Sequence, residues 1–345
     1  MSCGRRSITL AEHIMPEQPM NTDTSASGDH THEWRLADGR TLGYGLYGAS
    51  DGPLVVVLDG PGSRGLARAM ESPATQLGIK LLAPDRPGFG SSTPARERSI
   101  AAISGDLLAL VDHLGFRRFG LVAQSGGTPY ALAVAAAAGE RITGLAFIGA
   151  MAPLDAADAL RGVAHPMRIA SLLARRAPWL LRLLLNGLAL RSAKDPEAAA
   201  RKYAKRMPPD DRRVLADPAL WVIHVKSSAE IASCPAAFAR ELSMLVRPWS
   251  TKWDRISAPA ALWVGELDRG HPPSMSRRLA KLLGGAPVTV VAGAWTFAML
   301  PCYPDALRHA AALPENAAPS GGRASRAEFS TSNEAVGSRA DSARR

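Results

Sequence analysis

Cysteine and aromatic residues are scarce in this chain of 345 residues, and so are long apolar runs. The three cysteines, Cys3, Cys234 and Cys302, are odd in number and lack metal-ligand spacing. This excludes a disulfide framework and favours a reducing, cytoplasmic location. The longest apolar stretch, Trp179 to Leu190, is interrupted by Arg182 and is too short to span a bilayer.

Motifs for targeting, nucleotides and metals are also missing. No N-terminal apolar run has the length of a signal peptide, and methionines at 1, 15 and 20 leave the true start open. No module typical of nucleic-acid binding is present. We therefore expect no cofactor, no metal and no nucleic-acid partner.

Positive charge is concentrated in the middle of the chain. Of the formal net charge of +10, residues 151–255 contribute +8, from 18 Lys and Arg against 10 Asp and Glu. Basic residues alternate there with leucine at helical spacing, which indicates helices with a solvated basic face. Contact of this basic segment with a membrane surface, an acidic ligand or a partner protein is the alternative.

Strand and helix patterns alternate on either side of that segment. Five apolar runs predict strands, and amphipathic stretches with short connections lie between them: 54–58, 79–85, 119–122, 142–148 and 260–264. A hairpin is predicted over 33–44, with its turn at Asp38-Gly39, and a last strand over 288–291. This alternation predicts an α/β fold with a mostly parallel central sheet covered by helices on both faces.

The domain organisation follows from composition. We expect a disordered tail over 1–32, a core over 33–155, a helical lid over 156–255, the rest of the core over 256–313 and a disordered tail over 314–345. The lid is leucine-rich and broken by prolines. An apolar roof of this kind predicts a small hydrophobic substrate or ligand, whereas the oligomeric state is left open.

Ser125 lies at the turn between an apolar strand and an alanine-rich helix. Its neighbours Ala123, Gly126 and Gly127 are small, as a tight strand-to-helix turn requires. This is the nucleophile elbow GxSxG with alanine at the first position. Unpaired N–H groups at the start of the helix could stabilise an oxyanion there.

Four stretches together resemble the α/β-hydrolase superfamily over roughly Trp34 to Leu313. They are the loop 61–64, the Asp85-Arg86-Pro87-Gly88-Phe89-Gly90 turn, the Ser125 elbow and Gly265-Glu266-Leu267-Asp268 after a late strand. The resemblance implies a lidded serine hydrolase. It assigns Ser125 as nucleophile, Asp268 as the triad carboxylate, and the N–H groups of Gly126 and Gly60 as the oxyanion hole.

Two positions depart from the family pattern. The phrase Ala292-Gly293-Ala294-Trp295-Thr296-Phe297 has Thr296 where the family carries its histidine, and threonine is no base near pH 7. In the oxyanion loop, Asp59 stands where the family keeps histidine or glycine. A carboxylate pointing inward would oppose a developing oxyanion, whereas a neutral carboxyl or one turned to solvent would not.

Three histidines are candidates for a relocated base. We assign His271 to the catalytic site, because it lies three residues after Asp268 at the predicted catalytic edge of the sheet; His165 and His224, in the lid, are the alternatives. Two functions remain open at this stage. The chain is either a serine hydrolase of a hydrophobic ester-like or other acyl substrate, with a degenerate triad, or an impaired or non-hydrolytic relative that binds a small hydrophobic ligand.

Overall fold

The computed structural model describes residues 31–60, 62, 64–95, 99–155 and 158–314. Most of the two predicted tails, residues 1–30 and 315–345, therefore lies outside the described residues. Among the described residues, the core begins earlier than predicted. Thr31 and His32, which we assigned to the N-terminal tail, are the first residues of β1 and pair with Gly45 and Tyr44.

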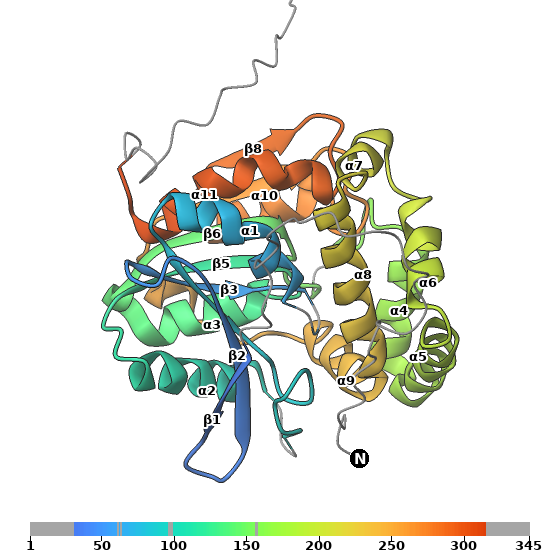
Figure 1. The fold of residues 1–345 in the computed structure, drawn as a ribbon, viewed down its shortest axis with the longest axis horizontal. Helices are drawn as coiled ribbons and strands as arrows, with labels where there is room; N and C mark the ends of the chain where they lie inside the picture. The colour runs from blue at the N-terminus through green and yellow to red at the C-terminus, as the bar shows by residue number, and fades with distance from the viewer. Residues whose placement is uncertain (1–30, 61, 63, 96–98, 156–157, 315–345) are drawn as a thin grey trace, which may run out of the picture.

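A mixed sheet of eight strands forms the centre of the molecule (Figure 1). Its order is β1-β2-β4-β3-β5-β6-β7-β8; β1, β2 and β4 pair antiparallel, and β4, β3 and β5 to β8 pair parallel. In chain order the strands are β1 (Thr31–Arg35), β2 (Thr41–Gly48), β3 (Leu54–Leu58), β4 (Lys80–Pro84), β5 (Phe119–Ser125), β6 (Ile142–Ala150), β7 (Ala260–Gly265) and β8 (Val288–Val291). The predicted α/β class is thereby confirmed.

Alternate side chains of the buried strands enter two separate hydrophobic cores. In β3, Leu54, Val56 and Leu58 pack into one core, and Val55 and Val57 pack into the other. Successive residues of a strand point to opposite faces of a sheet, so a continuous apolar run is what burial on both faces requires.

Helices cover both faces of the sheet. On one face α1 (Gly65–Gln76) and α11 (Tyr303–Ala311) share a core with β3, β5 and β6. On the other lie α2 (Ile100–His113), α3 (Thr128–Ala138) and α10 (Pro273–Leu282). Short 3-10 helices occupy 139–141, 253–255 and 297–302; the last of these, η3 (Phe297–Cys302), borders the site described below.

Six helices between β6 and β7 form the lid, which lies to one side of the sheet in Figure 1. They are α4 (His165–Arg176), α5 (Pro178–Ser192), α6 (Pro196–Ala204), α7 (Pro209–Val214), α8 (Pro218–Ser233) and α9 (Pro235–Leu245). A proline opens or follows the opening of every one of them, where its missing N–H costs no helical hydrogen bond. None of the described helices is long and apolar enough to cross a membrane.

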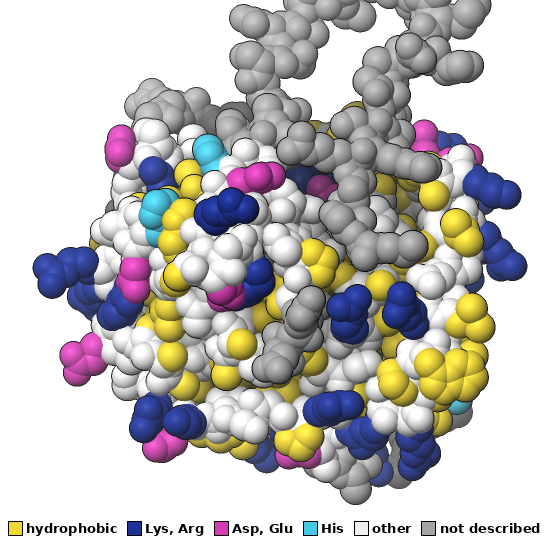
Figure 2. Space-filling view, turned by 90° about the horizontal axis from the view of Figure 1, so that it is seen from below, with side chains coloured by type: hydrophobic (Ala, Val, Ile, Leu, Met, Phe, Trp, Pro, Cys, Tyr) yellow, Lys and Arg dark blue, Asp and Glu magenta, His cyan; other side chains and the backbone are white. Residues whose placement is uncertain are grey.

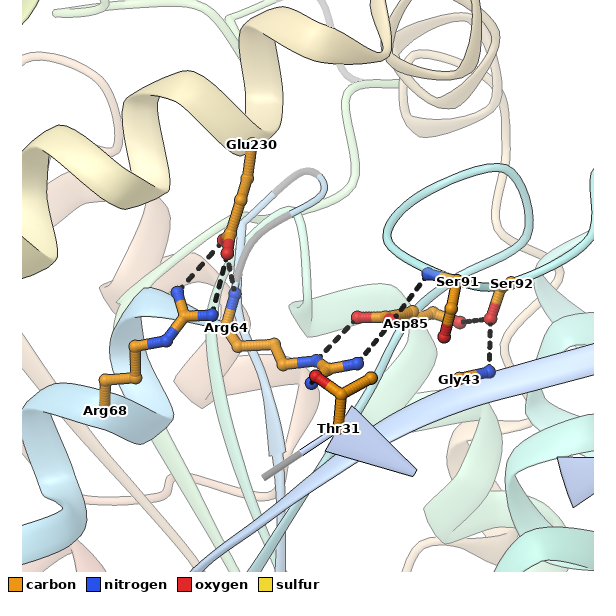
Figure 3. A network of polar contacts seen from close by, with 8 residues as sticks. All are labelled: Thr31, Gly43, Arg64, Arg68, Asp85, Ser91, Ser92 and Glu230. Atoms are coloured by element: carbon orange, nitrogen blue, oxygen red, sulfur yellow. Dashed lines mark hydrogen bonds and ion pairs between the residues drawn. The ribbon is translucent and has the colours of Figure 1, made fainter. Parts of the chain in front are cut away.

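An ion pair joins the lid to the core beside the loop that follows β3 (Figure 3). Glu230 on α8 accepts from both terminal nitrogens of Arg68 on α1, at 3.1 and 2.7 Å. Arg64, just before α1, binds the carboxylate of Asp85 through Nε at 2.8 Å and Nη2 at 2.5 Å. Because Arg64 and Asp85 are both buried, this paired charge fixes the end of the loop.

Candidate functional site

Ser125 ends β5 in a strained turn. Its φ of 51° is in the left-handed region, which side-chain-bearing residues rarely adopt. Gly127 makes the turn possible, since a Cβ there would lie 1.9 Å from the carbonyl oxygen of Leu58. Thr128 holds the turn by donating from Oγ1 to the Ser125 carbonyl at 2.8 Å and accepting from Met151 N at 3.1 Å. Strain of this kind clusters at functional sites.

The structure brings one of the three candidate histidines to the serine. Ser125 Oγ lies 3.1 Å from Nε2 of His271, which is within hydrogen-bonding reach. His271 belongs to the loop after β7, and β7 lies two strands away from β5 in the sheet. An imidazole therefore stands beside the hydroxyl although position 296 is threonine, and the serine does not lack a neighbouring proton acceptor.

The other two candidate histidines, both in the lid, lie elsewhere. His165 is the exposed first residue of α4. His224 is buried among the rings of Tyr203, Trp221 and Phe297, and its Nε2 lies 3.5 Å from the Ala200 carbonyl oxygen. Neither makes a hydrogen bond with Ser125 among the described residues.

Asp268 shapes the loop that presents His271. Its Oδ1 accepts from the backbone N–H groups of Gly270 and His271, both at 2.8 Å, and from Trp295 Nε1 at 3.0 Å. Within the described part of the chain, no hydrogen bond joins its carboxylate to the His271 ring. Asp268 thus positions the histidine through its main chain and acts on the ring through charge.

Burial dominates the electrostatics of both groups. Desolvation lowers the pKa of His271, and the nearby Asp268 charge opposes that shift only in part. Desolvation also raises the pKa of Asp268, against the His271 charge and the N–H groups that donate to it. A histidine with a lowered pKa is neutral at pH 7, which is the form that accepts a proton.

The loop after β3 lies against the serine, as an oxyanion loop must. A Cβ on Gly60 would stand 3.7 Å from both Cβ and Oγ of Ser125. However, Gly60 N–H donates to Oδ1 of Asp59 at 2.6 Å, and Asp59 Oδ2 accepts from Leu66 N at 3.0 Å. The Asp59 carboxylate therefore accepts the hydrogen bond of Gly60 N–H, which is one of the two predicted oxyanion donors. Gly126 N–H makes no hydrogen bond with the described residues.

Arg86 donates hydrogen bonds to the backbone of the same loop, an interaction that was not predicted from the sequence. Its Nη1 donates to the Asp59 carbonyl at 3.1 Å and its Nη2 to the Gly60 carbonyl at 2.5 Å. Its Nε donates at 2.7 Å to Glu241 on lid helix α9, and both side chains are almost fully buried. The signal for Arg86 was its place beside Asp85 in a matched motif, whereas Glu241 had none.

Thr296 lies in a loop that the lid binds. Asp211 on α7 is fully buried and accepts from the backbone N–H groups of Trp295, Thr296 and Phe297, at 2.6 to 2.8 Å. These N–H groups precede or begin η3, where a carboxylate is electrostatically favoured. The loop that carries histidine in the family thus serves here as an anchor for the lid. The only sign of this contact in the sequence was the pair of adjacent acids, Asp210 and Asp211, in a basic segment.

A cavity of about 830 Å³ lies between core and lid, and neither Ser125 nor His271 is among the residues that line it. Asp59, Gln124 and Thr296 line its floor, and Gln124 directly precedes Ser125. Its walls are mainly apolar and come from α1, α5, α6, α8, α9 and η3, including Leu66, Leu185, Leu188, Ile223, Phe238 and Phe297. Its size and lining suit a small hydrophobic molecule. No group of three or more His, Cys, Asp or Glu in the described residues could hold a metal ion.

Comparison with known proteins agrees with this architecture. A family model described as alpha/beta hydrolase fold matches residues 52–298. None of the curated proteins compared with the chain is similar to it. Among solved structures, an alpha/beta hydrolase fold protein from Nakamurella multipartita is 22% identical with a TM-score of 0.59, over 81% of this chain and 99% of that one.

Two further structures have stated activities. A thermophilic esterase from Thermogutta terrifontis is 21% identical with a TM-score of 0.56, covering 81% of this chain and 96% of its own. An epoxide hydrolase from Vigna radiata is 18% identical with a TM-score of 0.59, covering 81% and 96%. Identities this low establish the fold alone. With most of its length matched by the family model, the chain belongs to the alpha/beta hydrolase fold family.

Proposed function

We propose that the protein is a serine hydrolase of a hydrophobic ester-like or other acyl substrate, with Ser125 as nucleophile and His271 as general base. The observation that carries this proposal is the 3.1 Å distance between Ser125 Oγ and His271 Nε2, at a serine with φ of 51°. A nucleophile within hydrogen-bonding reach of a base is the arrangement that activates a serine hydroxyl.

The proposed reaction uses groups that already stand together. Ser125 Oγ attacks the substrate carbonyl carbon while its proton passes to His271 Nε2, and Gly126 N–H donates to the oxyanion. Collapse of the tetrahedral intermediate expels the alcohol, which takes the proton from Nε2. Water then attacks the acyl-enzyme by the same route. Asp268 keeps the loop of His271 in place and stabilises the imidazolium.

Covalent labelling tests the nucleophile. A fluorophosphonate probe should attach to the native protein at Ser125, as identified by mass spectrometry, and should not attach to Ser125→Ala. Thr128→Ser, which keeps the hydroxyl that holds the turn, serves as the control and should still be labelled. Folded native protein that takes no label would contradict the proposal and favour the ligand-binding alternative.

The acid side of the pH profile tests the base. His271 acts only when neutral, and its pKa is lowered by burial, so kcat/KM should fall on acidification only below about pH 6.5, the ordinary histidine value. Asp268→Asn removes a charge that raises this pKa, and should therefore move the acid limb to still lower pH. An acid limb above pH 6.5 in the native protein would exclude His271 as the base.

The ligand-binding alternative is favoured by one observation, the hydrogen bond from Gly60 N–H to Asp59. A donor bonded to its neighbouring carboxylate is not available to an oxyanion, and one such donor is worth about a hundredfold in kcat. The site would then bind an apolar ligand in the cavity and turn it over slowly.

Two substitutions at position 59 separate these possibilities. Asp59→Ala frees Gly60 N–H and should raise kcat for a nitrophenyl ester by about a hundredfold. Asp59→Asn is the matched control, because its amide oxygen can still accept from Gly60, whereas neither variant keeps the second carboxylate oxygen that accepts from Leu66 N. Equal rates for the two variants would show that this donor does not limit hydrolysis.

A further inference from the structure

The outer face of α5 is apolar and faces solvent. We define it by Trp179, Leu183 and Leu190, which are 70%, 61% and 71% exposed. Burying a leucine contributes roughly 1.5–3 kcal/mol, so leaving three large apolar side chains on one stripe of a helix in water is costly. A contiguous exposed patch of this kind marks an interaction site.

Helical spacing gathers these residues on one side. Trp179, Leu183 and Leu190 are separated by four and seven residues, which places them in one stripe. The opposite side carries the buried Leu181 and packs in the main core. Figure 1 shows α5 at the outer edge of the lid, on the side away from the sheet.

The charge carried by helices α4 and α5 has a single sign. Helices α4 and α5 together, residues 165–192, contain five arginines and no aspartate or glutamate. Arg175 is used internally, donating to the carbonyls of Leu154 and Val246 at 3.0 and 2.8 Å. The other four are exposed and form no ion pair with the described residues: Arg168, Arg176, Arg182 and Arg191. Figure 2 shows Lys and Arg next to hydrophobic side chains on the side where the lid lies.

We propose that the outer face of α5 docks on an anionic lipid surface. Leucine and tryptophan flanked by arginine is the composition of helices that lie in a membrane interface, where apolar side chains enter the acyl region and cations meet the headgroups. A second copy of the chain fits less well. A two-fold contact sets the same patch of both copies together, so the arginines would meet one another with no acidic partner.

The docked helix also borders the cavity. Leu185, Leu188 and Arg191 of α5 line it. A molecule leaving the lipid surface would therefore pass along α5 to reach the cavity. Docking itself does not depend on the chemistry proposed for Ser125. The Ser125→Ala variant should bind lipid as the native protein does, which keeps the two proposals separately testable.

Vesicle sedimentation tests the docking face. The native protein should sediment with phosphatidylcholine vesicles that contain phosphatidylglycerol, less so at high salt, and weakly with phosphatidylcholine alone. Leu183→Asp should lower the partition coefficient about tenfold or more, because a leucine side chain no longer enters the acyl region. Arg182→Gln should lower it about fivefold at low salt. Leu282→Asp, at an exposed leucine of α10, is the matched control and should change nothing.

Fluorescence tests whether Trp179 enters the membrane interface, and light scattering tests whether the native protein is a dimer. The difference in emission between native protein and Trp179→Phe should shift to the blue when anionic vesicles are added, because Trp179 enters the interface. Three results would overturn the proposal: no sedimentation with anionic vesicles, equal sedimentation of native protein and Leu183→Asp, or a native dimer that Leu183→Asp converts to a monomer. The last would identify the face as a contact between copies.

Discussion

His271→Ala should lower kcat for an activated ester about a millionfold, to the level of Ser125→Ala, because loss of the base in a serine hydrolase costs that much. Steady-state kinetics on the purified variants measures it, with KM expected to change little. The double variant should be no slower than either single one, since the two groups act as a unit.

His165→Ala and Thr296→Ala are the controls for that experiment. His165 is exposed on the lid, and Thr296 occupies the position where the family carries its base. Both variants should keep activity within a few-fold of the native protein. If His271→Ala retained native turnover, the assignment of the base would be wrong, and His224 would be the next group to test.

Arg86→Met should lower the free energy of unfolding by about 3–5 kcal/mol, the cost of leaving a buried charge without its partner. Glu241 is 1% exposed and would be deprived of the Arg86 Nε donor that lies 2.7 Å from it. The carbonyl oxygens of Asp59 and Gly60, beside Ser125, would also lose the hydrogen bonds that Arg86 donates to them. Urea unfolding of the variant and the native protein measures the difference.

Two further variants separate the buried pair from a simple charge effect. Arg86→Met combined with Glu241→Leu should recover much of the stability, because neither charge of the pair is then buried. Arg201→Met breaks the exposed pair with Glu197 and should cost less than about 1 kcal/mol. Equal decreases for Arg86→Met and Arg201→Met would mean that the buried pair adds nothing to the fold.

Most of the sheet could be predicted from sequence because its signals are local. Apolar runs such as 54–58 and 119–122 became β3 and β5, and Gly-rich turns marked their ends. The lid was predicted as helical from leucine spacing and proline breaks. The start of the core was placed two residues late, because Thr31 and His32 carry no apolar pattern and become strand only by pairing with β2.

The candidate site was harder to predict from the sequence, because its interactions join distant segments. Sequence order favoured His271 over two lid histidines, but its separation of 146 residues from Ser125 hides the approach of the two side chains. The direction of the Asp59 carboxylate was left open and depends on the N–H groups of Gly60 and Leu66. Asp211 and Glu241 have partners 84 and 155 residues away; an adjacent acid was the only sequence sign of the first contact, and the second had none.

Acid and proposed base here share one short peptide, Asp268 to His271, instead of coming from two separate loops. They can therefore be gained, lost or transplanted as a single unit by one small insertion or deletion. The segment after β8 has no imidazole at position 296, but its Trp295 connects α7 to this peptide: the Trp295 N–H donates to Asp211 and its Nε1 donates to Asp268. A substitution in the roof of the pocket at α7 would therefore be transmitted through one tryptophan to the carboxylate that positions His271.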